Sequence, residues 1–251
     1  MTDDRGPIYI AGLAHSAKTP FRLALAAHPD ISMTRRTYMW GRFHGRFGDL
    51  ADERNAERCL SAMLADGYVE TLAPDPERIR REFHEGPRDY AHLFALFHQH
   101  HAERLGKRRW GDQLGFVERF ADPIFAAFPS ARMIHMVRDP RGRPGSTTRR
   151  RRGAVGWNTA MWLESATLAE RNRRRYPDAY RVVRSESFAA EPLDTLEELC
   201  EFLGETCLPS MREALIATGV GDKAARPSNR IAIAARRLVG SRGGRNEVRS
   251  T

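Results

Sequence analysis

The feature that most constrains the fold is a short apolar run that ends at a glycine and passes directly into a helix. Residues 7–13 read Pro-Ile-Tyr-Ile-Ala-Gly-Leu, which predicts a buried strand that ends at Gly12. Residues 19–27 predict a helix, and Pro20 suits its first turn because the N–H groups there have no helical partner anyway. A strand, a glycine turn and a helix in this order form the opening unit of a parallel sheet.

The rest of the chain continues this alternation of strands and helices. Further strands are predicted at residues 108–112, 131–137 and 180–184. Helices are predicted at residues 51–65, 77–83, 90–105, 115–128, 157–175, 192–203 and 210–218. Residues 33–50 hold three Gly and four Arg without a clear period, and we predict a loop near the substrate there. No internal repeat interrupts the pattern.

The pattern predicts one α/β domain with three layers, in which a central, mainly parallel sheet is flanked by helices. We assign residues 1–218 to this domain and residues 33–105 to a largely helical insertion on its substrate side. Residues 219–251 form an Arg- and Gly-rich C-terminal tail.

The positive charge of the chain is concentrated in two segments. The net charge is +9, yet residues 132–152 and residues 223–249 each carry a net +7, so the rest is net negative. Only three of the 41 basic residues are Lys, and an Arg cluster suits phosphate or sulfate because the guanidinium fork donates to two oxygens at once. A general preference for Arg, with a solvated charge run at residues 149–152, explains the excess equally well.

The sequence also limits where the protein acts. It has no apolar run of about 18 residues, so no membrane-spanning helix is expected, and its acidic first residues do not resemble a secretory signal. The three cysteines are odd in number and lack a metal-binding spacing. We expect a cytoplasmic protein without structural disulfides. The oligomeric state is left open.

The first candidate site is the segment Gly12-Leu-Ala-His-Ser-Ala-Lys-Thr19, which follows the P-loop pattern with Ala17 in place of the second glycine. Between a strand and a helix, such a loop directs backbone N–H groups at a bound anion. Lys18 would add a positive charge and Thr19 a hydroxyl. The alternative is an ordinary helix start whose lysine points into solvent, and the Cβ of Ala17 would hinder a positive φ.

The second candidate site begins at Arg138, which follows the strand predicted at residues 131–137 and precedes Ser146 by eight positions. In an open parallel sheet, ligands bind at the carboxyl ends of the strands, where both Gly12 and Arg138 are expected. A ligand with two phosphates would span the two sites. The alternative for Arg138 is an ion pair with Asp139 or with a neighbouring carboxylate.

These segments resemble the nucleotide-binding motifs of sulfotransferases. The loop Gly12-Leu-Ala-His-Ser-Ala-Lys-Thr19 is similar to their 5′-phosphosulfate loop, G-x-P-[RK]-S-G-T-T. The segment Ile134-His-Met-Val-Arg-Asp-Pro-Arg141 with Ser146 is similar to their 3′-phosphate segment, V-R-D-P-R-D-x-x-x-S, and the interval from Arg to Ser agrees.

Two further stretches follow in the same order as in that family. Arg109-Trp-Gly-Asp-Gln113 is similar to the family's W-G-E-K-T-P strand end. Tyr180-Arg-Val-Val-Arg-Ser-Glu186, with Glu191-Pro and Leu199-Cys-Glu-Phe-Leu-Gly204 after it, is similar to Y-x-x-V-R-Y-E-D-L…P…L-C-x-F-L-G. The resemblance covers residues 7–30 and 105–205.

The resemblance implies a P-loop-like α/β fold for the domain at residues 1–218. It also implies 3′-phosphoadenosine-5′-phosphosulfate as donor, adenosine 3′,5′-bisphosphate as product, and in-line sulfuryl transfer without a required metal. The acceptor would be a hydroxyl or amine on a small or lipid-linked molecule. By position, the 5′-phosphosulfate would contact Ser16, Ala17, Lys18 and Thr19, and the 3′-phosphate would contact Arg138 and Ser146. His15 and Lys18 would stabilise charge on the leaving phosphate.

Several positions depart from the family pattern. Ala14, His15, Ala17 and Lys18 stand where the loop usually has Pro, Arg or Lys, Gly and Thr, and Gln113 and Ser185 replace a Lys and a Tyr. His15 is a weaker cation than arginine at pH 7, since an unperturbed imidazole titrates near ~6.5. We expect Lys18 to take over that charge.

Asp112 is the first candidate for the base that activates the acceptor, because it matches the acidic residue of W-G-E at a strand end. The alternative is an ion pair with Arg108 or Arg109. His98 and His101 share a helix face, but no carboxylate lies at a matching spacing, so we expect no metal site there. His44 lies in the irregular segment and is a further candidate for substrate contact.

Two other function classes remain open at this stage. One is a catalytically degenerate relative that binds a nucleotide, or nucleic acid through its Arg-rich segments, although a nucleic-acid partner is not expected. The other is an ATP-dependent P-loop phosphotransferase. That class needs an acidic magnesium ligand at a strand end, whereas Val137 is followed by Arg138.

Overall fold

The computed structural model describes residues 5–140 and 154–221. Its centre is a sheet of five parallel strands in the order β2-β3-β1-β4-β5. The strands are β1 (Ile8–Ala11), β2 (Ile31–Arg35), β3 (Arg109–Gln113), β4 (Arg132–Val137) and β5 (Tyr180–Arg184). Because all strands run the same way, their carboxyl ends meet at one edge of the sheet.

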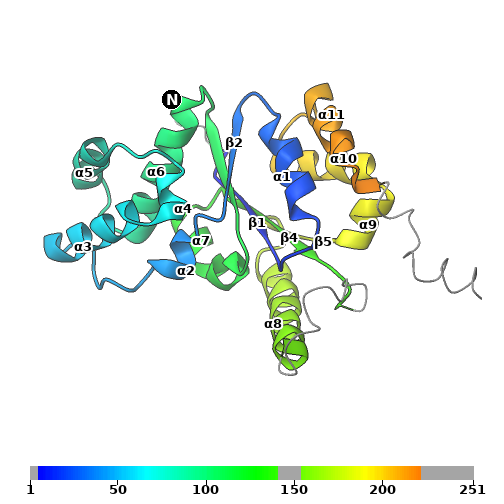
Figure 1. Cartoon of the computed structure of the whole chain (residues 1–251), viewed down its shortest axis with the longest axis horizontal. Coiled ribbons are helices and arrows are strands. Elements are labelled where there is room, and N and C mark those ends of the chain that lie inside the picture. Colours follow the sequence, from blue (N-terminus) through cyan, green and yellow to red (C-terminus); the bar gives the residue numbers. More distant parts are fainter. Residues whose placement is uncertain (1–4, 141–153, 222–251) are drawn as a thin grey trace, which may run out of the picture.

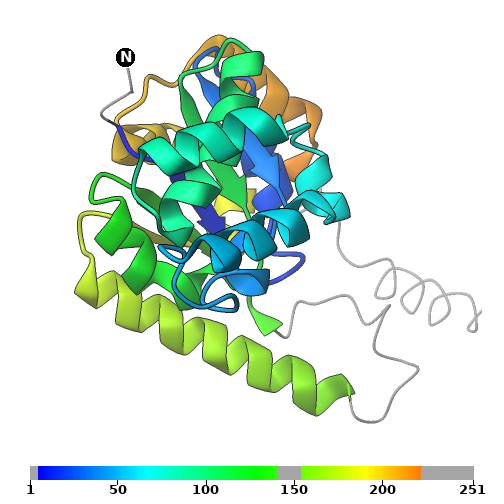
Figure 2. The same ribbon diagram turned by 90° about the vertical axis from the view of Figure 1, so that its left-hand side faces the viewer.

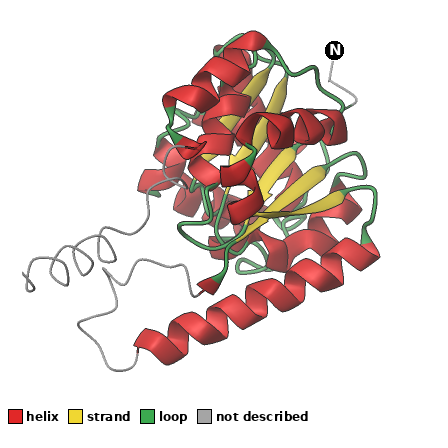
Figure 3. Ribbon diagram, turned by 90° about the vertical axis from the view of Figure 1, so that its right-hand side faces the viewer, coloured by secondary structure: helices red, strands yellow, loops and turns green. Residues whose placement is uncertain are grey.

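Helices cover both faces of the sheet (Figures 1 and 3). They are α1 (Lys18–Ala26), α2 (Met39–Arg42), α3 (Glu53–Leu64), α4 (Gly67–Glu70), α5 (Pro76–Glu85), α6 (Tyr90–Arg104), η1 (Val117–Phe120, a 3₁₀ turn), α7 (Ala121–Ala127), α8 (Ala154–Arg175), α9 (Ser185–Ala190), α10 (Pro192–Leu203) and α11 (Pro209–Ala217). Helices α2–α7 lie on one side of the sheet, and α1 with α9–α11 lie on the other (Figure 1). The long α8 lies below the sheet in Figure 1 and runs along the bottom of the molecule in Figure 2.

The alternation of side chains along β1 explains this layered arrangement. Ile8 and Ile10 pack into a core shared with α1, α10 and α11, whereas Tyr9 and Ala11 face a second core that includes α6 and α7. All four residues are at most 1% exposed. A parallel sheet buried on both faces requires such a continuously apolar strand. The predicted α/β fold with a central parallel sheet is therefore confirmed.

Two local predictions were wrong. Residues 33–50 are not a loop throughout, since β2 extends to Arg35 and α2 follows. The alternation of apolar and polar residues from Ile31 to Thr34 is short, and all four side chains are buried within β2. Residues 115–128 are not one helix, because Phe116 has a φ of 66° and a 3₁₀ turn precedes α7. The left-handed conformation at Phe116 prevents a helix from extending back to residue 115.

The packed core extends beyond α11. Val220 is 6% exposed and belongs to the core that contains α1 and α10. Most of the predicted tail, residues 222–251, lies outside the described residues. Within the described part of the chain, none of the helices has the length and apolar character that crossing a membrane requires.

Candidate functional site

The loop that joins β1 to α1 lies at the carboxyl edge of the sheet and begins at Gly12. Gly12 has a φ of 110°, and a Cβ at this position would come within 2.2 Å of the Met136 carbonyl oxygen on β4. Only glycine therefore allows the loop to leave β1 this close to the neighbouring strand. The loop and the end of β4 are brought together by this contact.

The loop has the left-handed residues expected of an anion-binding turn. His15 has a φ of 67° and Ala17 a φ of 60°, and Ala17 is the residue that precedes the first turn of α1. Successive backbone N–H groups in such turns converge on one point and form a concave anion site. Inside the loop, the Ser16 hydroxyl donates to the Leu13 carbonyl oxygen at 2.8 Å.

Two distant segments hold the outer side of this loop. Arg138, just after β4, donates from Nη1 to the His15 carbonyl oxygen at 2.9 Å. Ser185, at the start of α9, donates from its hydroxyl to the Ser16 carbonyl oxygen at 2.9 Å. The loop conformation is thus fixed by the strand ends of β4 and β5.

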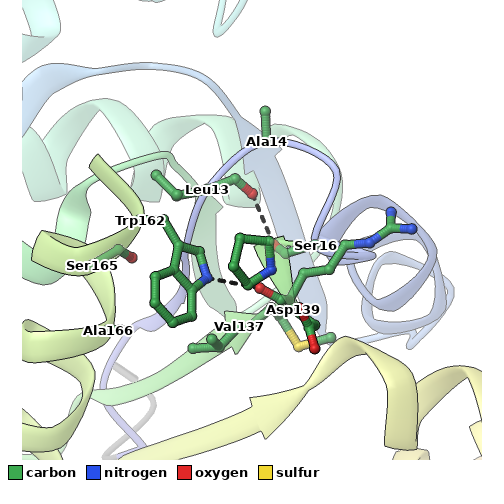
Figure 4. Close-up of a pocket in the computed structure, with 11 residues that line it drawn as sticks. Leu13, Ala14, Ser16, Val137, Asp139, Trp162, Ser165 and Ala166 are labelled. Carbon is green, nitrogen blue, oxygen red and sulfur yellow. Dashed lines mark hydrogen bonds between the residues drawn. The ribbon is translucent and has the colours of Figure 1, made fainter. Parts of the chain in front are cut away.

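The end of β4 is itself anchored to α8. The indole N–H of Trp162 donates to the Arg138 carbonyl oxygen at 2.8 Å (Figure 4). Beside it lies a small cavity of ≈ 20 Å³, lined by residues of the loop, of β4 and of α8. This volume is about that needed by one water molecule. Trp162 thereby fixes the backbone from which Arg138 projects.

A much larger cleft of ≈ 860 Å³ opens above the loop. It is lined by residues 13–20 together with Arg36, Tyr38, Gln113, Gly115, Phe116, Arg138, Ser185, Glu186, Ala189 and Val220. Its volume falls in the range of about 300–1,000 Å³ that is typical of small-molecule sites. The carboxyl ends of β1, β2, β3, β4 and β5 all contribute to it.

Backbone strain is concentrated around this cleft. With the exception of Ala73, every non-glycine residue that has a positive φ in the described ranges lines it, namely His15, Ala17, Arg36, Tyr38 and Phe116. Each such residue costs about 1–3 kcal/mol and persists only where the surrounding structure enforces it. Strain of this kind gathers at binding and catalytic sites, and its coincidence with the cleft marks the cleft as the candidate site.

The cleft is predominantly positive. Lys18, Arg36 and Arg138 reach it, and Glu186 is the single carboxylate among its described lining residues. Glu186 Oε1 accepts the backbone N–H of Asp139 at 2.9 Å, which joins α9 to the end of β4. The arrangement suits a ligand with more than one anionic group.

Lys18 is 7% exposed, and its Nζ donates to the Gly12 carbonyl oxygen. Burial lowers the pKa of Lys18 to about 8, while the nearby carboxylate of Glu118 opposes that shift. The ammonium group is therefore still protonated at pH 7 but titrates just above it. The lysine does not point freely into solvent, as the alternative reading of an ordinary helix start supposed.

Asp112 lies on β3 beneath the cleft rather than on its surface. It is 1% exposed, and Oδ2 accepts a hydrogen bond from the Thr37 hydroxyl. Burial raises the pKa of Asp112 to about 6, against the effect of that hydrogen bond. The alternative partners pair elsewhere, since Arg108 bonds to Asp30 and Arg109 to Glu205.

Of the histidines considered from the sequence, His15 lines the cleft, whereas His44, His98 and His101 lie outside its lining. His98 stacks on Trp110 with ring centroids 4.6 Å apart, and its burial lowers its pKa to about 3. His44 is half-buried and packs against Trp40 and the aromatic side chains around it. No group of three or more His, Cys, Asp or Glu with metal-site geometry occurs among residues 5–140 and 154–221.

The structure brings most of the predicted anion-binding residues into one cleft: His15, Ser16, Ala17, Lys18, Thr19 and Arg138. Ser146 and residues 149–152 lie outside the described residues. The sequence did not predict Arg36, Tyr38, Phe116 or the buried Glu118 as parts of the site. Arg36 follows a strand end, and this position is the signal that could have identified it once β2 was recognised.

Comparisons with known proteins agree with this arrangement. The sequence profile of the Sulfotransferase family matches residues 7–209. Among curated proteins, none matches significantly. A solved structure of the sulfotransferase domain from the Synechococcus PCC 7002 olefin synthase has a TM-score of 0.56 at 20% identity, covering 84% of this chain and 77% of that domain. The sulfotransferase domain from the curacin biosynthetic pathway gives a TM-score of 0.53 at 17% identity, covering 82% and 76%.

At these identities the two domains establish a shared fold, and the profile match extends over most of the chain and includes both candidate anion-binding segments. The chain belongs to the sulfotransferase family.

Proposed function

We propose that the protein transfers a sulfuryl group from 3′-phosphoadenosine-5′-phosphosulfate to a hydroxyl or amine of a small or lipid-linked acceptor. The observation that carries the proposal is the single positive cleft shared by the loop at residues 12–19 and Arg138. Two phosphate-bearing ends of one nucleotide would occupy these two places. We propose a cytoplasmic reaction, where the free cysteines Cys59, Cys200 and Cys207 would stay reduced.

The residues present fit this donor. The turn formed by His15 and Ala17 offers backbone N–H groups to the 5′-phosphosulfate, with the N-terminus of α1 behind it. Arg138, with Ser146 as its proposed partner, would hold the 3′-phosphate. When bound, the donor supplies an activated sulfuryl group whose departure leaves the bisphosphate product.

The chain itself would stabilise charge and position the acceptor. Lys18 and His15 are proposed to stabilise the negative charge that develops on the leaving phosphate oxygen. Gln113 supports a hydroxyl or amine acceptor, because the residue lines the cleft and its buried Oε1 accepts no hydrogen bond from the described residues. An O–H or N–H group of the acceptor would satisfy that oxygen.

Asp112 is proposed to take the proton of the acceptor. Its pKa of about 6 lies close to neutral pH, where a general base works best. Its neighbour Gln113 lines the cleft, so the proposal requires the acceptor hydroxyl to reach the carboxyl group past that side chain.

The test is calorimetric titration with adenosine 3′,5′-bisphosphate. The wild type should bind, and Arg138→Ala should bind about 10–100-fold more weakly, the value of one or two charge-assisted hydrogen bonds. Arg132→Ala, at the other end of β4, is the matched control and should bind like the wild type. An absence of binding, or equal binding by Arg138→Ala and wild type, would overturn the proposal.

A second candidate function is nucleotide binding without turnover. The side chains of Lys18 and Ser16 both bond to carbonyl oxygens of their own loop, Gly12 and Leu13, which favours this reading. Binding of the bisphosphate together with an absence of sulfuryl transfer to any member of a hydroxyl and amine panel would support it.

A further inference from the structure

A fully buried carboxylate lies directly under the loop at residues 12–19. Glu118, in the turn η1, is 0% exposed, and its Oε2 lies 3.4 Å from the backbone nitrogen of Gly12, which donates to it. A buried charge is strongly unfavourable unless it is paired and hydrogen-bonded. A negative charge beneath an anion site is doubly unfavourable, so its presence there requires an explanation.

Glu118 is held by groups from α8 and β4. Ser165 on α8 donates to Glu118 Oε1 at 2.8 Å, and the Asn172 side chain donates to the Glu118 carbonyl oxygen at 2.8 Å. His135 on β4 places Nε2 3.7 Å from Oε1. These contacts fix both the position of the side chain and the direction of its charge.

Lys18 and this carboxylate meet at Gly12, because Lys18 Nζ donates to the Gly12 carbonyl oxygen and the Gly12 N–H donates to Glu118 Oε2. Both side chains are buried, and the charge of Glu118 raises the pKa of Lys18 against the lowering effect of burial. Arg36, beyond the end of β2, acts in the opposite direction. His135 on β4 also faces the pair, but burial lowers its pKa, so it is neutral at pH 7.

The cleft lining carries further titratable or charged groups, and one of them, Glu186, is a carboxylate that accepts the backbone N–H of Asp139. His15 is exposed on the same loop, and Arg138 reaches the loop from β4. Neither His15 nor Arg138 can favour the protonated form of Lys18 as Glu118 does, because both groups are positive when protonated. Within the described structure, Glu118 is the carboxylate whose charge favours the protonated form of Lys18.

We propose that Glu118 is a positioning residue that keeps the Lys18 side chain protonated within the loop and holds the Gly12 end of that loop against β4. The proposal rests on the proposed binding of a nucleotide phosphate in the cleft. In this role, the buried acid maintains the positive charge of Lys18 for an anionic ligand. Removing the carboxylate should leave burial and Arg36 unopposed, so that Lys18 loses its proton at a lower pH.

The direct test is NMR titration of the lysine side chains, which this chain makes simple because it has only three lysines. Lys18→Met assigns the Lys18 Cε signal. In the wild type that signal should titrate near pH 8, and in Glu118→Gln the midpoint should fall by about one unit or more, the usual effect of a close opposite charge. A wild-type midpoint at the ordinary value of about 10.4 would overturn the proposal without any variant.

Two controls separate charge from structure. Glu118→Asp retains the negative charge and should keep the midpoint near that of the wild type. Ser165→Ala removes one hydrogen bond to the carboxylate but no charge, and it should also leave the midpoint unchanged. If Ser165→Ala lowers the midpoint as much as Glu118→Gln does, the effect is one of packing and the proposal is wrong.

The functional arm measures bisphosphate affinity between pH 6.5 and 9. Wild-type affinity should fall as pH rises through about 8, the fall should move to lower pH in Glu118→Gln, and Lys18→Met should lack it. The same profile in wild type and Glu118→Gln would overturn the role of Glu118. No binding at any pH, combined with the expected NMR shift, would overturn the proposed ligand and leave the Glu118–Lys18 coupling established.

Discussion

The hydroxyl of Ser185 donates a hydrogen bond to the carbonyl oxygen of Ser16 at 2.9 Å, joining residues that are 169 positions apart in the sequence. Ser185 begins α9 at the carboxyl end of β5, whereas Ser16 lies in the loop after β1. The bond is buried, so its loss would leave the carbonyl oxygen without a partner. Ser185 therefore stabilises the conformation of the loop.

This relationship gives the first prediction. Ser185→Ala should weaken bisphosphate binding by about 3–10-fold, because one buried hydrogen bond contributes about 1 kcal/mol to the loop conformation. Ser187→Ala, an exposed serine on the same helix, is the matched control and should change nothing. Isothermal calorimetry of both variants makes the comparison, and equal affinities would show that the loop does not depend on this bond.

The left-handed conformation of Ala17 predicts an unusual effect of glycine. Ala17→Gly should raise the free energy of unfolding by about 1 kcal/mol, because glycine adopts a positive φ without the clash of a Cβ. Ala62→Gly, within α3, should lower it by about 1 kcal/mol. Urea denaturation distinguishes the two signs, and a loss of stability in both variants would contradict the strain at Ala17.

The buried carboxyl of Asp112 predicts a pH-dependent stability. Its folded-state pKa of about 6 exceeds the value of about 3.9 in the unfolded chain, so the folded state binds more protons between these values. Stability contributed by the neutral carboxyl is therefore lost as pH rises from about 4 to 6. Asp112→Asn should be more stable than the wild type at pH 7.5, on the order of 2 kcal/mol, and similar near pH 4.

The same variant tests the proposed base. Asp112→Asn should lose sulfuryl transfer while it gains stability, and thermal unfolding at the two pH values can be measured beside turnover. A variant that is stabilised yet fully active would remove Asp112 from the mechanism. A variant that is destabilised at pH 7.5 would contradict the buried, ionised carboxylate.

Two adjacent arginines at the start of β3 should differ sharply in their effect on stability. Arg109 is buried, and its Nη1 lies 2.7 Å from Glu205 Oε1, whereas Arg108 forms an exposed pair with Asp30. Glu205→Ala should cost about 3–5 kcal/mol because it leaves a buried charge without its partner. Asp30→Ala should change stability by less than about 1 kcal/mol.

Chemical denaturation of these two variants compares the contribution of the buried ion pair to stability with that of the exposed one. Bisphosphate affinity should be unchanged in Asp30→Ala, since this pair is remote from the cleft lining. Similar losses of stability in both variants would contradict the difference in burial.

The sequence predicted those parts of the fold in which an apolar pattern is bounded by a residue such as Pro or Gly that begins or ends a helix. Strand β5 and helix α10 begin and end where predicted, because Pro192 and Gly204 mark the ends of the helix. Strand β2 was missed although apolar and polar residues alternate from Ile31 to Thr34, because this alternation is short and passes directly into a segment without a clear period. The burial of Ser32 and Thr34 shows that packing covers the polar face of that strand as well.

The candidate site divides in the same way. The loop at residues 12–19 and Arg138 follow strand ends that the sequence reveals, so their meeting in one cleft could be expected. Glu118 could not be, because its proximity to Gly12 depends on a 3₁₀ turn that packs under the loop. Arg36 depends likewise on the unrecognised strand β2 and on its own positive φ.

The long-range bonds of the loop have a consequence for how the protein is made. The segment at residues 12–19 leaves the ribosome before Arg138 and Ser185, because its bonded residues precede them by 123 and 169 positions. A nascent chain that ends before β4 therefore carries the loop without the groups that shape it. The cleft is therefore complete only when synthesis has passed the start of α9, so a partly made chain has no finished site to offer a ligand.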